Sequence, residues 1–176
     1  KSNKIIEQIK KACLNEGFFT VVGHGVPLNL INSILICSKK FFDLPAKKKL
    51  SIAPQKWNKE NSNVYRGYFP SYVNGKEGLD IGDPNITNSI YETLQKEKFE
   101  YLNLKKVLDD QSIFTINLYF DTLFRLGKLL FKSILKSLDA DSNIADKAFI
   151  RPKTLTTLRF NYYHKQNKPI EISKND

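Results

Sequence analysis

Residues 16–27 read EGFFTVVGHGVP, and this stretch decides how the rest of the chain is interpreted. Its centre, residues 18–22, is apolar apart from one threonine, which predicts a short strand buried on both faces. The glycines on either side of His24 predict a sharp turn after that strand, because glycine readily adopts positive φ. Pro27 suits the first turn of a following helix. We interpret His24 as a structural residue that hydrogen-bonds backbone groups of the turn, not as a metal ligand.

The composition predicts a folded protein and argues against a nucleic-acid partner. The chain has 176 residues, of which 41% are hydrophobic, enough for one domain with a real core. Its net charge is +10, but 24 lysines spread along the whole chain and four arginines are not the clustered arginine pattern of nucleic-acid readers. No apolar run is long enough to span a membrane, and the first residues, KSNKIIEQIKKA, predict an amphipathic helix rather than a signal sequence. We therefore expect a cytoplasmic monomer that binds neither nucleic acid nor membrane.

Two further features concern cysteine and methionine. Cys13 and Cys37 fall on apolar faces of predicted helices, so we expect two buried free thiols. Methionine is absent even at position 1, from which we expect the chain to be a piece of a longer protein.

Hydrophobic periodicity predicts three helices and one good strand. The helices cover residues 3–15, a segment from Pro27 to before Pro45 that is followed by one more turn, and about 112–139. Residues 52–75 predict an irregular loop, 76–85 a short extended piece with a turn, and 86–110 an exposed, partly helical linker. Residues 154–163 alternate as a strand does. Because no strand of comparable quality precedes this one, the sequence indicates that most of the sheet lies beyond Asp176.

Four stretches, in order, resemble one family. They are ACLNEGFFTVVGHGVP, KKFFDLPAKKKL, YRGYFP with GKEGLDIG, and TTLRFNYY. Together they are similar to the N-terminal region of the iron(II)- and 2-oxoglutarate-dependent oxygenases of the isopenicillin N synthase-like group. The resemblance implies an α+β fold, in which a helical region with a long central helix packs on a double-stranded β-helix, the jelly roll. It assigns residues 1–150 to the helical region, with a strand at 18–22 and a loop at 52–85. Residues 151–176 become the start of the jelly roll.

The resemblance also implies the chemistry of the intact protein. Members oxidise small organic substrates by hydroxylation, desaturation or cyclisation, using Fe(II), 2-oxoglutarate and O2, with ascorbate as an optional reductant. Iron is held by a His-x-Asp motif and a distant histidine. The two histidines here, His24 and His164, are not followed two residues later by a carboxylate, and the Arg-x-Ser that grips 2-oxoglutarate is missing. We therefore expect neither catalytic residues nor metal ligands in this chain, and no turnover by the chain alone.

Five residues are candidates for the site. Asn161 and Tyr163 match the family positions that hydrogen-bond 2-oxoglutarate, and strand alternation puts them on one face together with Arg159. Arg159 would meet either an anionic group or an internal carboxylate. Tyr65 and Phe69 lie in the loop that contributes to the substrate pocket of relatives.

The pair Lys76 and Glu77, and the single residue His164, are interpreted as structural. One alternative function also stays open. Lys76 and Glu77 predict a lysine–glutamate pair that fixes the neighbouring loop. His164 occupies the place where relatives commonly have proline, and we do not assign it as a ligand. The alternative function is a non-catalytic binding or interaction module derived from the same family. The substrate itself is not readable from this sequence.

Overall fold

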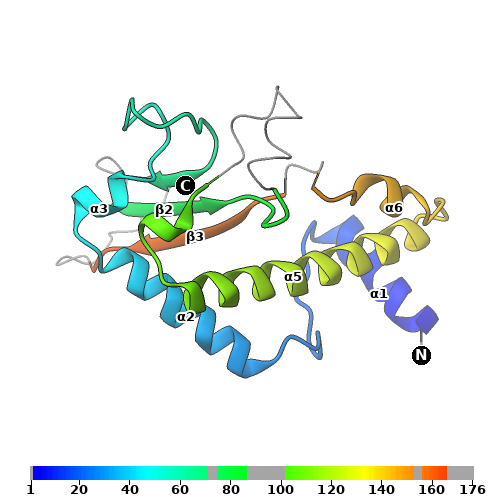
Figure 1. The fold of residues 1–176 in the computed structure, drawn as a ribbon. Helices are drawn as coiled ribbons and strands as arrows, with labels where there is room; N and C mark the ends of the chain where they lie inside the picture. Colours follow the sequence, from blue (N-terminus) through cyan, green and yellow to red (C-terminus); the bar gives the residue numbers. More distant parts are fainter. Residues whose placement is uncertain (1, 71–74, 87–101, 153–155, 166–176) are drawn as a thin grey trace, which may run out of the picture.

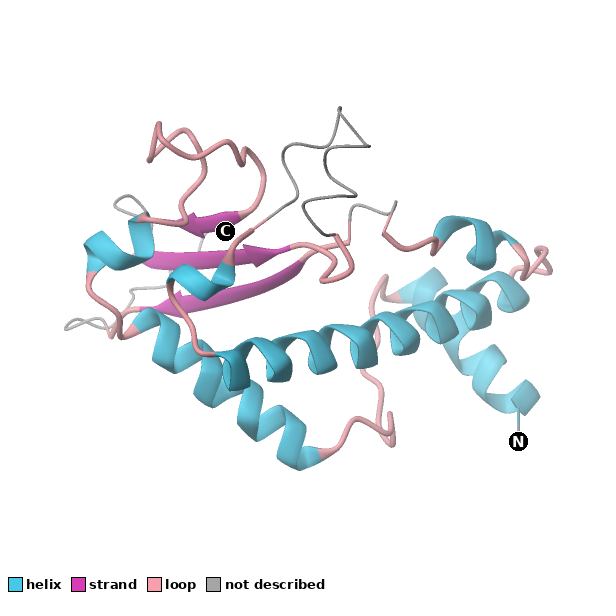
Figure 2. Cartoon of the chain, in the orientation of Figure 1, coloured by secondary structure: helices cyan, strands magenta, loops and turns pink. Residues whose placement is uncertain are grey.

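The computed structural model describes residues 2–70, 75–86, 102–152 and 156–165. Figures 1 and 2 show the longer helices below a small sheet, with short helices to either side of it. The helices are α1 (Ser2–Asn15), α2 (Leu28–Phe42), α3 (Ala46–Leu50), the 3-10 turn η1 (Leu104–Lys106), α5 (Asp110–Ser137) and α6 (Ile144–Ala148). The strands are β1 (Gly67–Phe69), β2 (Lys76–Ile81) and β3 (Leu158–Tyr163). The predicted helices are thus all present, and the long central one is confirmed.

The sheet has three antiparallel strands in the order β1-β2-β3. β2 pairs with β1 on one edge and with β3 on the other, so that Glu77 lies opposite Tyr162 and Leu79 opposite Phe160. The sequence interpretation was wrong to leave β3 without an earlier partner. It underrated β2 because KEGLDI has a glycine and three charged residues, which lower strand propensity. β1 was missed altogether, since three residues carry no readable periodicity.

The core lies between the sheet and the helices α2 and α5. These two helices pack on each other beneath the strands (Figure 1), and α1 contacts α5 as well. Phe41 and Leu79 are fully buried, and Ile116 of α5 is 1% exposed. α5 begins at a well-formed cap, because the Asp109 carboxylate accepts a hydrogen bond from the Ser112 N–H at 2.7 Å. Burial of these large apolar side chains supplies most of the stability of the layer.

The opening stretch differs from its prediction in one respect. Residues 18–22 form no strand, and Phe18 and Val22 are 73% and 91% exposed instead of buried. A hydrophobic run predicts the tendency to form a strand but not a hydrogen-bonding neighbour, and no described strand pairs with this segment. The turn after it is as expected: Gly23 and Gly25 have φ of 64° and 74°, and the Val26 N–H donates to His24 Nδ1 at 3.1 Å. His24 therefore has the structural role assigned to it.

The expectations for the cysteines and for the segment before α5 are met only in part. Cys37 is buried and Cys13 half-buried, and both are free thiols. The segment before α5 is less exposed than predicted, because Leu104 and Val107 join the core. Residues 87–101 of the predicted linker, and 154–155 of the predicted strand, lie outside the described residues.

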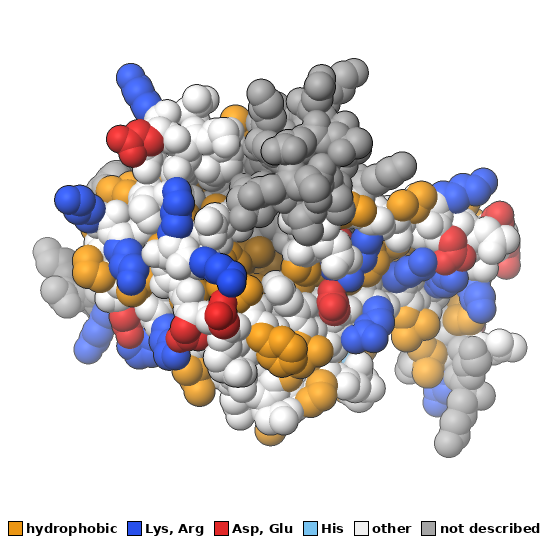
Figure 3. Space-filling model, viewed as in Figure 1, with side chains coloured by type: hydrophobic (Ala, Val, Ile, Leu, Met, Phe, Trp, Pro, Cys, Tyr) orange, Lys and Arg blue, Asp and Glu red, His pale blue; other side chains and the backbone are white. Residues whose placement is uncertain are grey.

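Charge is distributed over the surface in small groups. Figure 3 shows lysines and arginines at both ends of the visible face, with acidic side chains among them. Part of this mixing is direct pairing, since Lys128 and Lys132 both lie within 3 Å of the Asp146 carboxylate. Within the part of the chain that the structure describes, no helix combines the length and apolarity needed to cross a bilayer.

Candidate functional site

The two faces of the sheet have different environments. Side chains alternate along each strand, so one face carries Tyr68, Glu77, Leu79, Ile81, Leu158, Phe160 and Tyr162. This face packs on the core and is called the helix face. The other carries Phe69, Lys76, Gly78, Asp80, Arg159, Asn161 and Tyr163, and is called the open face. On β3 every open-face residue is exposed, with Tyr163 at 70%. Four of the five predicted site residues therefore lie together on the open face, namely Phe69, Arg159, Asn161 and Tyr163. The fifth, Tyr65, lies in the loop before β1.

An ion pair crosses the open face between β2 and β3. Asp80 lies directly opposite Arg159, and the guanidinium donates through both Nε and Nη2 to the two carboxylate oxygens. The Asp80 hydrogen bonds raise the pKa of Arg159, against the opposing effect of burial, so the guanidinium stays charged. The sequence left two partners open for Arg159, an anionic ligand group or an internal carboxylate. In the described structure its partner is an internal carboxylate, that of Asp80. Asp80 itself is 2% exposed, so the pair fixes where the arginine head lies.

Asn161 and Tyr163 lie next to this pair along β3. Asn161 is opposite Gly78 and Tyr163 opposite Lys76. Both side chains are exposed, and an amide together with a phenol offers donors to a carboxylate. The geometry that the alternation predicted, two donors one strand repeat apart on one face, is present. It is compatible with holding a dicarboxylic acid.

The β1 side of the open face is aromatic. Phe69 meets Trp57 edge to face at a centroid distance of 5.3 Å, and the Arg159 guanidinium lies 6.0 Å from the Phe69 ring centre. Tyr65 is 60% exposed in the loop that leads into β1. Trp57 was not predicted as part of this region, because it lies twelve residues before Phe69 in a segment without periodicity. Only the folded loop brings the two rings together.

Glu77 is the centre of a buried ionic cluster on the helix face. Its Oε2 accepts hydrogen bonds from Lys49 Nζ and Tyr68 Oη, both at 2.5 Å, and His164 Nε2 lies 2.8 Å from Oε1. Burial raises the pKa of this carboxyl, but the hydrogen bonds from Lys49 and Tyr68 and the nearby positive charge outweigh it, so the pKa lies below its usual value. The predicted lysine–glutamate pair exists with Lys49 in place of Lys76. Lys76 could not serve, because neighbours along a strand point to opposite faces.

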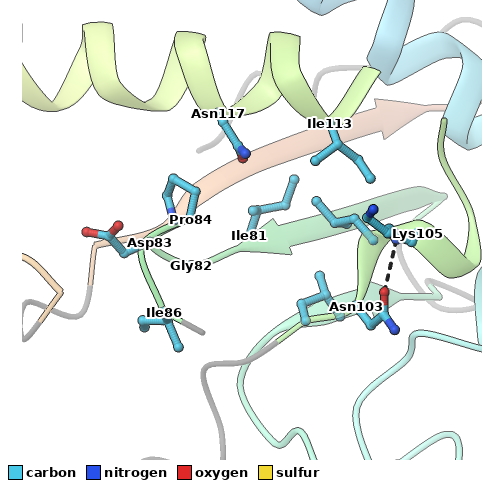
Figure 4. Close-up of a pocket in the computed structure, with 11 residues that line it drawn as sticks. Ile81, Gly82, Asp83, Pro84, Ile86, Asn103, Lys105, Ile113 and Asn117 are labelled. Atoms are coloured by element: carbon cyan, nitrogen blue, oxygen red, sulfur yellow. Dashed lines mark hydrogen bonds between the residues drawn. The ribbon is translucent and has the colours of Figure 1, made fainter. Parts of the chain in front are cut away.

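Two cavities lie away from the open face. One of about 170 Å³ sits at the end of β2 between η1 and α5 (Figure 4), and is lined by Ile81, Gly82, Asp83, Pro84, Ile86, Leu102, Asn103, Leu104, Lys105, Ile113 and Asn117. The other, of about 220 Å³, is lined by Phe120, Leu123, Phe124, Gly127, Phe149, Thr156, Thr157 and Leu158. Neither contains a predicted site residue. The candidate site is therefore the sheet surface and not one of these cavities.

The described residues do not offer an iron site. Across them, no three His, Cys, Asp or Glu side chains are grouped closely enough to hold a metal ion. His24 is engaged by its own turn, and His164 by Glu77. The donors on the open face suit an organic carboxylate better than a transition metal, which prefers imidazole and carboxylate ligands. No metal-dependent step is assigned to these residues.

Solved structures define the class of fold. A C-terminally truncated protein of Neurospora crassa, solved in apo form, superposes with a TM-score of 0.67 at 21% identity, over 91% of this chain and 55% of that one. JOX2, solved with 2OG, Fe and JA, gives a TM-score of 0.67 at 20% identity, over 93% of this chain and 45% of that one. The helical region with its small antiparallel sheet therefore has the fold of the corresponding part of these two structures.

Sequence comparison gives the family. The family model described as non-haem dioxygenase in morphine synthesis N-terminal matches residues 1–115, so the chain belongs to this family of non-haem dioxygenases. A 2-oxoglutarate-Fe(II) type oxidoreductase of Aspergillus fumigatus is 28% identical over 93% of this chain and 50% of its own length. The 2-oxoglutarate-dependent dioxygenase tropC of Talaromyces stipitatus is 42% identical over 40% of this chain and 21% of its own length. The chain thus spans at most about half the length of these two relatives.

Proposed function

We propose that this chain is part of a non-haem Fe(II), 2-oxoglutarate-dependent oxygenase that oxidises a small organic substrate. The observation that carries the proposal is the family match over residues 1–115. Iron and 2-oxoglutarate are the proposed cofactors, and the iron ligands would come from residues other than these 176. A small molecule is the proposed substrate, and a monomer the proposed state.

The open face is the proposed binding surface. Asn161 and Tyr163 would donate hydrogen bonds to a carboxylate of 2-oxoglutarate, since both are exposed, face the same side and have no other partner among the described residues. Arg159 would contribute its positive charge while Asp80 holds it in place. Phe69, with Tyr65 in the preceding loop, would form an apolar boundary toward the substrate. In this arrangement the chain binds and orients, and the oxidation is supplied by bound iron and O2.

The test is turnover of 2-oxoglutarate by the protein expressed from its complete coding sequence. With Fe(II), O2 and ascorbate present, we expect succinate to form from 2-oxoglutarate, and we expect the 176-residue chain alone to form none. Asn161→Ala should raise the KM for 2-oxoglutarate about tenfold, as expected for a lost hydrogen bond to a charged group. A complete protein that forms no succinate with any candidate substrate would overturn the proposal in favour of a non-catalytic binding module.

A further inference from the structure

The cavity at the end of β2 is built mainly from aliphatic side chains (Figure 4). Its volume is about 170 Å³, and most of its lining comes from Ile81, Pro84, Ile86, Leu102, Leu104 and Ile113. A cavity of roughly 150 Å³ holds one benzene molecule, so this one has room for a single six-membered ring. No aromatic side chain is among its described lining residues. The cavity therefore suits a small aliphatic group, whose binding gains from the burial of apolar area.

One side-chain amide in this cavity is available to a ligand, that of Asn117. Asn117 lies one turn after Ile113 on α5, and Figure 4 shows both side chains pointing toward the end of β2. It is half-buried, and its amide makes no hydrogen bond to any described residue. The other asparagine of the lining, Asn103, already accepts a hydrogen bond from the Lys105 N–H at 3.1 Å. Asn117 therefore presents an N–H donor and a carbonyl acceptor side by side.

The charged residues of the lining are neutralised by partners of their own. Asp83 accepts hydrogen bonds from Arg151 Nε and Nη2, at 2.6 and 2.7 Å, and its side chain is fully buried. Lys105 Nζ lies 3.2 Å from a carboxylate oxygen of Asp110. A charged ligand would therefore lose its hydration in the cavity without meeting an unpaired ion of opposite sign. The cavity favours a neutral ligand.

We infer that this cavity is a second binding site of the protein, and that its ligand is a small neutral aliphatic molecule with an amide edge. A lactam or a carboxamide carries a carbonyl acceptor next to an N–H donor, so it forms two parallel hydrogen bonds with the Asn117 amide. A ketone of the same size forms one. Asn117 is then the residue that determines specificity, because the rest of the lining is aliphatic or already paired. The inference concerns no residue of the open face and does not depend on the proposed function.

The test compares three ring molecules of similar size. δ-Valerolactam has the amide edge, cyclohexanone keeps the ring and the carbonyl without the N–H, and the piperidinium ion carries a positive charge. Each is titrated into the iron-free protein expressed from its complete coding sequence, and saturation-transfer NMR measures binding. We expect δ-valerolactam to bind with a Kd on the order of 1 mM, as expected for so few atoms. Cyclohexanone should bind about fivefold more weakly for the lost hydrogen bond, and piperidinium should show no saturable binding.

Substitutions test whether the lactam lies in the cavity. Asn117→Leu keeps the approximate size of the side chain and removes the amide, so δ-valerolactam and cyclohexanone should then bind equally. Asn32→Leu changes an exposed asparagine of α2 in the same way and should leave the difference between the two ligands unchanged. Ile86→Trp should abolish binding of both rings, because the larger side chain fills the cavity. If circular dichroism shows that Ile86→Trp is not folded, the comparison of Asn117→Leu with Asn32→Leu decides.

A saturating concentration of 2-oxoglutarate should leave δ-valerolactam bound, because the open face is not involved. Equal affinity of the wild-type protein for the lactam and either of the other rings would overturn the inference, as would a lactam preference that survives Asn117→Leu. Displacement of the lactam by 2-oxoglutarate, or no saturable lactam binding, would overturn it too. None of these results bears on succinate formation, so a failure of this inference is distinguishable from a failure of the proposed function.

Discussion

The two faces of the sheet carry ion pairs with different surroundings. On the helix face, Glu77 is 7% exposed and pairs with the equally buried Lys49, while Tyr68 and His164 provide two further polar contacts. On the open face, Asp80 is buried but its partner Arg159 has a side chain that is 54% exposed. The first arrangement holds α3, β1 and the end of β3 together. The second leaves a cation at the surface, which suits binding. Burial of both partners thus distinguishes a structural pair from a pair that can serve a ligand.

The largest expected effect comes from breaking the helix-face cluster. Glu77→Gln leaves Lys49 buried with no opposite charge, and removal of one partner from a buried pair typically costs about 3–5 kcal/mol. Urea unfolding followed by Trp57 fluorescence measures the loss in the free energy of unfolding. Glu60→Gln is the matched control, because Glu60 is exposed and should change stability by less than about 0.5 kcal/mol. If both variants unfolded at the same urea concentration, the distinction between the two pairs would be wrong.

The two faces should also differ in how they tolerate truncation. Leu79 on the helix face is fully buried, so Leu79→Ala should lower the free energy of unfolding by about 2–5 kcal/mol through lost burial and a cavity. Asn161→Ala on the open face should change it by less than about 0.5 kcal/mol. Thermal melts of the two variants measure this difference. A strongly destabilised Asn161→Ala would mean that the open face is part of the core.

The pH dependence of stability follows from the same cluster. The pKa of Glu77 is lowered in the folded protein from an ordinary value of 4.5, so its ionised form stabilises the fold above that pH. As pH falls below 4.5 and through the folded pKa, this contribution is lost, at a limiting slope of about 1.4 kcal/mol per pH unit. Wild type should therefore lose more stability than Glu77→Gln on acidification. Parallel stability curves for the two proteins below pH 4.5 would contradict the account.

The sequence correctly predicted the helices and the residues that share one face of β3. It did not predict which residues from distant parts of the chain contact one another. Alternation alone placed Arg159, Asn161 and Tyr163 on one face, because a strand repeats every two residues. It could not show that Asp80 lies opposite Arg159, since register between distant strands is set by packing. For the same reason Lys76 was chosen where Lys49 pairs with Glu77, and Trp57 was missed beside Phe69. Residues 18–22 show the converse: a strong strand pattern without a neighbour among the described strands.

The central claim is that the open face, and not the helix face, holds the co-substrate. Tyr162 and Tyr163 are adjacent residues of one type on opposite faces: Tyr162 stacks on Phe42 at 5.2 Å, and Tyr163 is exposed. The KM for 2-oxoglutarate should be measured for Tyr162→Phe and Tyr163→Phe in the complete protein. We expect Tyr163→Phe to raise it about tenfold and Tyr162→Phe to leave it unchanged. Equal KM values for the two variants, or a rise with Tyr162→Phe alone, would contradict the assignment of the open face.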